Sequence, residues 1–254
     1  MSLFTDGPVS NIQDLSAYDS QLLDVASTEG IDLTRKLAAA QDDLAVELSV
    51  LLANLKFADQ PLWLIAAPNL ANVVVTQPLK LWHLYLSLEM VYRDAYNTEL
   101  NDRYAGKRDQ FQQLAEWARE KLIQTGIGVA AHPLAQAATP QVITIPGALA
   151  DGTYFVSIAW VNAAGEEGAS AEPALVTISG SALEVQPAAA PENATGWNVY
   201  IGSEPEAMVL QNQSPIGVGG VWQQIMPATT TGPKPGAGQN PTYLKPLPRV
   251  LQRG

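Results

Sequence analysis

The chain has 254 residues, 47% hydrophobic and 15% charged, which is enough for two domains and too apolar for global disorder. Its formal net charge of −11 argues against broad nucleic-acid binding, and the absence of cysteine excludes disulfides and thiolate metal sites. Residues 1–11 lack the basic and apolar regions of a signal peptide, and the most apolar stretch, residues 62–75, is too short for a membrane span, so we expect no membrane partner.

Helical periodicity dominates the first half of the chain. It predicts helices over residues 14–27, 32–55, 78–104 and 107–125, and a buried loop or short strand over residues 62–75. The second helix carries one leucine-rich stripe from Leu33 to Leu55. The third begins at Pro78 and has hydrophobic residues on more than one face, which we interpret as surface that meets neighbouring subunits.

A change of composition after Gly126 predicts a domain boundary. No lysine or arginine occurs between Lys121 and Lys234, and a small-residue linker with two prolines spans residues 130–141. Beyond it the period becomes two, as in residues 196–202, where three hydrophobic side chains alternate with polar ones. Seven short strands are expected, over residues 142–145, 153–161, 175–178, 183–185, 197–201, 208–211 and 221–226. They indicate an antiparallel sandwich with Trp197, Val199 and Ile201 between its sheets.

The last part of the chain is predicted to be an extended arm. Residues 229–254 hold five prolines and four glycines and are not expected to form a regular core element. A disordered tail would not need the hydrophobic residues spaced among the prolines, so we favour docking on a partner. The residues expected to dock are Tyr243, Leu244, Lys245, Leu247, Arg249, Val250, Leu251 and Arg253. The predicted domains are therefore a helical domain 1–130, a β-sandwich 138–230 and an arm 231–254.

No catalytic, cofactor or metal site is expected. The only histidines are His83, in an apolar helix, and His132, before a linker proline, and the sequence indicates no serine beside either. We expect His83 to have a packing or interface role. Zinc would need more His or Cys than the chain has, or a carboxylate-rich site, for which the sequence shows no recognisable spacing. Two carboxylate pairs, Glu166 with Glu167 and Glu204 with Glu206, are interpreted as solvated loop charges.

Two segments, residues 16–48 and 79–118, carry a resemblance to a known family. Through "EGIDLTRKLAAAQDDL", the aromatic third helix and "DRYAGKRDQF", the first half resembles head–tail adaptor (connector) proteins of tailed bacteriophages. Through "GTYFVSIAWVNAAGEEG" and "ATGWNVYIGSEPEA", the second half looks like the fibronectin type III or Ig-like modules found on phage structural proteins. The expected fold is thus an N-terminal helical bundle, an all-β Ig/fibronectin III-like sandwich and the arm.

The resemblance implies a structural role in the virion neck, with assembly in the cytoplasm of the bacterial host. Such adaptors form rings, usually of twelve subunits, that join the portal to tail or neck proteins and extend the DNA channel without specific DNA binding. A C-terminal segment often anchors on the portal. The ring interface is expected to use the aromatic residues of the third and fourth helices, namely Trp82, Tyr85, Tyr92, Tyr96, Tyr104, Phe111 and Trp117.

Two alternatives stay open at this point. The first is a cell-surface or glycan-binding protein that uses Trp160, Trp197 or Trp222 as a sugar platform, which requires exposed aromatic rings. The second is an enzyme with an accessory fibronectin-like domain, which requires a catalytic constellation.

Overall fold

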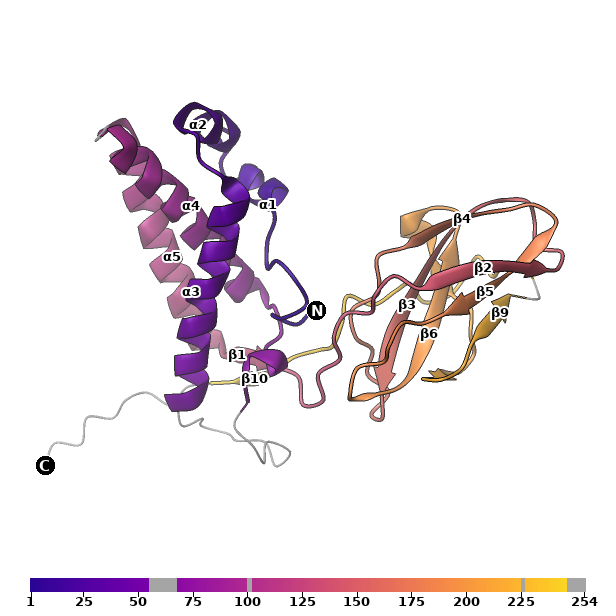
Figure 1. Cartoon of the computed structure of the whole chain (residues 1–254). Helices are drawn as coiled ribbons and strands as arrows, with labels where there is room; N and C mark the ends of the chain where they lie inside the picture. Colours follow the sequence, from indigo (N-terminus) through magenta and orange to yellow (C-terminus); the bar gives the residue numbers. More distant parts are fainter. Residues whose placement is uncertain (55–67, 100–101, 225–226, 246–254) are drawn as a thin grey trace, which may run out of the picture. The chain divides into compact units, whose positions relative to one another are not determined.

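The structure, a computed structural model, describes residues 1–54, 68–99, 102–224 and 227–245 (Figure 1). They form two compact units. The helical unit contains Gly7–Ala131 and the described residues from Pro241 onward, and the β unit contains Met1–Asp6 and His132–Asn240. The chain therefore passes from one unit to the other three times. These boundaries differ from the predicted ones, because the first six residues belong to the β unit and Pro241–Lys245 belong to the helical unit.

The helical unit is built from five α-helices and two short 3-10 helices among its described residues. They are α1 (Ile12–Tyr18), α2 (Leu22–Glu29), α3 (Leu33–Asn54), η1 (Leu70–Asn72), α4 (Gln77–Glu99), η2 (Asp102–Tyr104) and α5 (Ala105–Thr125). The first predicted helix is two helices in the structure. Asp19 has an extended backbone with φ −142°, so α1 ends there and the chain turns before α2. The buried loop or strand expected over 62–75 lies partly outside the described residues, and Val73 and Val74 are buried.

Helix α4 lies at the centre of the helical unit and contacts α1, α2, α3 and α5. Its hydrophobic residues therefore occupy more than one face because the chain's own helices surround it, which is typical of a buried helix. The interpretation that these extra faces meet neighbouring subunits is not needed to explain the pattern. The side chains buried on α4 are Leu79, Trp82, His83, Leu84, Tyr85, Ser87, Leu88, Glu89, Met90, Val91, Tyr92 and Ala95.

A short strand pair closes the helical unit and was not predicted. Strand β1 (Ile127–Val129) follows α5 directly and pairs antiparallel with β10 (Thr242–Leu244). Val73 makes a further bridge to Val129. Gly128 permits this close approach, because a Cβ there would lie 2.7 Å from Thr76 and 2.9 Å from Pro241. The arm thus contributes a regular element after all, and its Leu244 is fully buried.

The β unit contains two antiparallel sheets. One has the order β2 (Gln141–Pro146), β5 (Ser181–Gln186), β9 (Trp222–Gln224). The other has the order β4 (Ala174–Ile178), β3 (Gly152–Asn162), β6 (Ala194–Gly202), β7 (Val209–Leu210), and β8 (Ile216–Gly217) also pairs with β6. A 3-10 turn, η3 (Pro205–Ala207), precedes β7. The prediction of helices followed by antiparallel strands is confirmed.

One hydrophobic core joins the two sheets of the β unit. It includes Leu183 and Val185 of β5 together with Trp197, Val199 and Ile201 of β6, as the alternating pattern predicted. The opposite face of the β3–β6 pair is covered too, because Ala159, Tyr200 and Met208 form a second small buried cluster. The period-two pattern therefore placed these strands correctly.

Candidate interaction surfaces

The aromatic residues expected at a ring interface lie mainly inside the helical unit. Trp82, Tyr85, Tyr92, Tyr104 and Phe111 are buried within the chain itself. Tyr96 is partly buried, with the Arg108 guanidinium 4.5 Å from its ring centre. Trp117 differs from all of them, because it is 45% exposed on α5. A role in a ring interface stays a prediction for this set, and Trp117 has the most surface to offer.

One of the buried aromatic residues, Tyr92, meets a buried carboxylate. Asp19 accepts a hydrogen bond from the Tyr92 hydroxyl at 2.5 Å and from Lys107 Nζ at 3.2 Å, and the Tyr92 ring stacks on Phe111 at 5.6 Å between centres. Burial favours a raised pKa for Asp19, but the hydrogen bonds from Tyr92, the Gln21 amide and Lys107 hold the pKa below its ordinary value. Burial and the Asp19 bond raise the pKa of Tyr92. This cluster joins the α1–α2 turn to α4 and α5.

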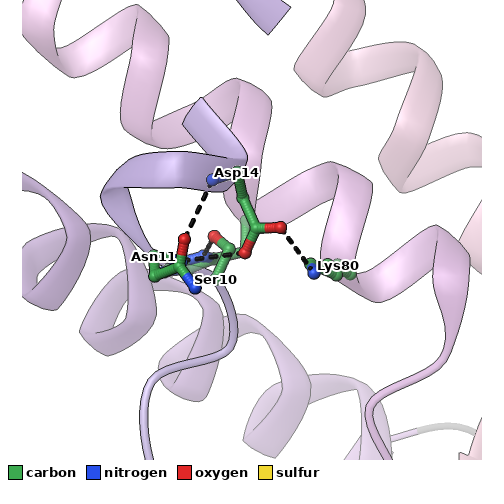
Figure 2. Close-up of polar contacts among 5 residues, drawn as sticks. Ser10, Asn11, Asp14 and Lys80 are labelled. Carbon is green, nitrogen blue, oxygen red and sulfur yellow. Dashed lines mark hydrogen bonds and ion pairs between the residues drawn. The ribbon is translucent and has the colours of Figure 1, made fainter. Parts of the chain in front are cut away.

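A second polar cluster fixes the start of α1 (Figure 2). Asn11 and Asp14 form a reciprocal capping box, in which each side chain accepts a hydrogen bond from the other's backbone amide. Asp14 also forms an ion pair with Lys80 of α4 at 2.8 Å. Burial opposes ionisation of Asp14, but the Lys80 and Asn11 hydrogen bonds hold the pKa of this carboxyl below its usual value.

Next to this cap, a serine and a histidine meet, which the sequence did not indicate because they are far apart in the chain. Ser10 Oγ lies 2.6 Å from His83 Nδ1, and His83 Nε2 lies 3.0 Å from the carbonyl oxygen of Leu37. Since a carbonyl oxygen only accepts, Nε2 carries the proton and Nδ1 accepts from the Ser10 hydroxyl. Burial lowers the pKa of His83, which favours this neutral ring, although the Leu37 bond and Asp14 act in the opposite direction.

The Ser10–His83 pair has the spacing of a nucleophile and its base. His83 is fully buried and Ser10 is only 3% exposed, so the pair has almost no access to solvent in this conformation. What the contact does is join three segments, the entry to α1, helix α3 through Leu37, and helix α4. This agrees with the packing role expected for His83.

A groove opens between the entry to α1 and helix α3. It has a volume of about 730 Å³. We call it the α1–α3 groove; it is lined by Pro8, Ser10, Asn11, Ile12, Gln13, Thr34, Leu37, Ala38, Gln41 and Asp42. Its walls are held by Gln41, whose side chain accepts from the Val9 amide at 3.2 Å and donates to the Gly7 carbonyl at 3.0 Å. Asp42 is the only charged residue of the lining.

The outward face of α3 carries exposed apolar side chains. Val46 is 66% exposed and Val50 is 51% exposed, and their spacing of four places them on the same face of the helix. The segment from Leu37 to the end of α3 contains three acidic residues and no cation. Helix α5, which bears Trp117, contains four cations, Lys107, Arg108, Arg119 and Lys121, and three acids, Asp109, Glu116 and Glu120, and its Arg119 pairs with Glu47 of α3 in the same chain. Both helices therefore combine exposed apolar surface with charge.

The predicted docking arm is used in part by its own chain. Leu244 is buried in β10, whereas Tyr243 and Lys245 are exposed. The other five predicted docking residues, Leu247, Arg249, Val250, Leu251 and Arg253, lie outside the described residues. Docking of the arm on a partner stays a prediction for residues beyond Lys245.

Among the described residues of the β unit, no tryptophans form an exposed platform. Trp160 and Trp197, two of the three rings proposed for sugar binding, are buried in the core, and Trp222 is partly buried. Glu204 and Glu206 are exposed, as expected. Glu166 and Glu167 are not simply solvated, because Glu166 accepts from Asn162 and Gln239 and Glu167 accepts from Tyr200 at 2.6 Å. These carboxylates hold the loop after β3.

Known proteins give no guide to the role of these surfaces. No protein-family model, curated protein or solved structure matches the chain. Across the described part of the chain, no three His, Asp or Glu side chains gather as a metal site, and no helix there is long and apolar enough to cross a membrane. The surfaces described above are therefore the basis for assigning a function.

Proposed function

We propose that the chain is a structural protein of the tailed-phage virion, a head–tail adaptor that forms a ring between the portal and the tail. The observation that carries the proposal is the exposed apolar surface on two helices of one unit, at Val46 and Val50 of α3 and at Trp117 of α5. Exposed apolar side chains on two different helices suit a head-to-tail contact, in which those of one helix meet those of the other helix on the next copy and the rotation closes a ring.

Charge supports the same proposal. Like charges facing each other oppose contact between the α3 faces of two copies, since Asp42, Asp43 and Glu47 would meet. Helix α5 carries four cations among its charges, so its surface opposes the acidic α3 face of another copy less than a second α3 face does, although Arg119 and Glu47 already pair within one chain. The net charge of −11 also weakens attraction to DNA, which fits a channel through which DNA passes without specific binding.

The β unit is proposed to be an Ig/fibronectin III-like module on the outside of the neck. The adjacency of β2 with β5, β3 with β6 and β6 with β7 corresponds to the B–E, C–F and F–G pairs of the immunoglobulin arrangement. The module departs from that arrangement because β9, the last strand of the β unit, pairs with β5.

The partners in this proposal are further copies of the chain, the portal, and tail or neck proteins, and the location is the virion. No catalytic role is proposed. Burial of Trp160 and Trp197 removes the main support for glycan binding.

Assembly of the purified chain tests the proposal. Native mass spectrometry and electron microscopy of the full chain, alone and with the portal of the same phage, should show rings. The double variant Val46→Lys/Val50→Lys should remain monomeric, because the two added ammonium groups on the α3 face would have to lose their water in an apolar contact. The control Val221→Lys changes an equally exposed valine, 51%, in the β unit and should still form rings. A chain that stays monomeric with the portal and is missing from purified particles contradicts the proposal.

A further inference from the structure

We infer that the α1–α3 groove of one copy binds the C-terminal segment of a second copy, residues Pro246–Gly254. The inference rests on the proposed function, because it requires that copies of the chain meet. It adds which two surfaces make the contact between them. The segment follows directly after β10, whose Leu244 is fixed against β1, so its point of departure from the helical unit is defined.

The chemistry of the groove suits this segment. Pro8, Ile12, Leu37 and Ala38 give the groove apolar walls, and its volume of about 730 Å³ lies in the range of pockets that hold small ligands or several side chains. The segment "PLPRVLQRG" supplies Leu247, Val250 and Leu251. Its two prolines reduce the conformational entropy lost on binding, because the proline ring restricts φ before binding takes place.

The charges are complementary. No cation lines the groove, and its one charged residue is Asp42, with Asp43 next to it on α3. The segment carries Arg249 and Arg253 and no acidic residue. In a chain with a net charge of −11, this is a cationic end without an acid, and an acidic, apolar groove is the matching surface.

The groove of a second copy is a better binding site for the segment than the groove of its own copy, because the segment is short for the distance to its own groove. Figure 1 shows α1 and α2 near one end of α3 and the β1–β10 pair near the other. The groove is centred near Ala38, whereas Ala53, close to η1, marks the other end of the helix. These positions are separated by about 22 Å at about 1.5 Å per residue. Leu247 can extend only about 10 Å beyond Leu244 and Val250 only about 20 Å, so within one copy only Leu251 and the residues after it, fully stretched, would reach the edge of the groove.

Cysteine cross-linking in the full chain tests the inference, since the natural chain has no cysteine. A chain with Ala38→Cys, in the groove, is mixed with a chain carrying Val250→Cys under mild oxidation. The matched control replaces the acceptor with Gln124→Cys, an exposed residue of α5. Residence of the segment in the groove raises the local thiol concentration, so the Ala38→Cys pair should form mixed disulfide dimers at least about tenfold faster than the control pair.

A charge exchange sharpens the result. Asp42→Lys in the acceptor chain should slow the cross-link, and Arg249→Glu with Arg253→Glu in the donor chain should restore it. Equal cross-linking rates for the two acceptor chains overturn the inference. So does a chain that carries both Ala38→Cys and Val250→Cys and forms the disulfide only within one molecule. Rings that form with equal cross-linking rates reject the groove and leave the proposed function standing. Fast groove-specific links without rings or particle incorporation reject the proposed function and leave the groove site standing.

Discussion

The elements within each of the two units are held together by different interactions. In the helical unit, side chains that lie far apart in the sequence make buried polar contacts between helices, as Asp19 does with Tyr92 and as Ser10 does with His83. In the β unit, the core between the sheets is apolar and its largest members are Trp160 and Trp197. The difference follows from the backbone. A helix satisfies its hydrogen bonds internally, so only side chains can join helices, whereas strands are joined by the backbone ladder itself.

The largest expected effect is the loss of a side chain from the apolar core of the β unit. Trp197→Ala should destabilise the β unit by about 3–5 kcal/mol, because it removes a fully buried ring and leaves a cavity between the sheets. Urea unfolding followed by circular dichroism should show an early β transition while the helical signal persists. The control Trp117→Ala removes an exposed ring and should change stability by less than about 0.5 kcal/mol.

A somewhat smaller effect is expected when a buried polar contact of the helical unit is removed. Asp19→Asn should cost the helical unit about 2–3 kcal/mol, because it removes the charge that Lys107 and Tyr92 face in a buried site. Chemical denaturation monitored at the helical signal measures the loss. Asp109→Asn, which removes an exposed partner of Arg108, should change stability by less than about 1 kcal/mol. Equal losses in the two variants would contradict the central role of Asp19.

The next effect concerns pH. Acidification should change the stability of the helical unit through its buried histidine. Burial lowers the pKa of His83 below its ordinary value of 6.5, so the unfolded chain takes up this proton before the folded one does. The contribution of His83 to stability is present above about pH 6.5 and is lost as pH falls through the lowered folded pKa. Glu89, whose pKa is raised by burial, acts in the opposite direction above its ordinary value of 4.5.

The comparison of wild type with His83→Gln isolates the histidine. Urea unfolding of the helical unit between pH 7 and pH 5 should show a smaller loss of stability in the variant than in the wild type. A wild-type slope that the substitution leaves unchanged would show that His83 does not titrate in this window. Asp14 and Asp19, whose pKa values are lowered, extend the acid sensitivity of the helical unit below about pH 4.

The smallest expected effect concerns a helix end. Asn11→Ala removes the side chain that caps α1 and should cost about 1 kcal/mol. Ser16→Ala changes an exposed hydroxyl on the same helix and should stay within about 0.5 kcal/mol. Thermal unfolding of the two variants side by side gives the difference, and equal values would argue that the cap is not formed in solution.

Much of the fold could be predicted because it depends on local pattern. The leucine stripe gave α3 and the alternation in residues 196–202 gave β6, since burial of one face leaves a period in the sequence. The split at Asp19 was missed because its cause is distant: the carboxylate is held by Tyr92 and Lys107. The all-round hydrophobicity of α4 was assigned to neighbouring copies because sequence alone does not say that a helix is central.

The candidate surfaces were predicted less well than the fold. Trp117 was named among the interface residues, but Val46 and Val50 were not, since an exposed valine and a buried one look alike without the register of the whole helix. The Ser10–His83 contact and the β1–β10 pair were also missed. Both depend on long-range pairing between short segments, which no local periodicity records.

The pairing of Ile127 with Leu244 has a consequence for biosynthesis. The ribosome delivers the helices first, yet the strand that follows α5 must wait for its partner until the entire β unit has been translated. Such a distant closure slows folding, because a long loop must be ordered before the contact forms. Until Thr242–Leu244 have been made, the nascent helical unit lacks the strand that pairs with β1, and cutting the chain before Pro241 would make that intermediate permanent.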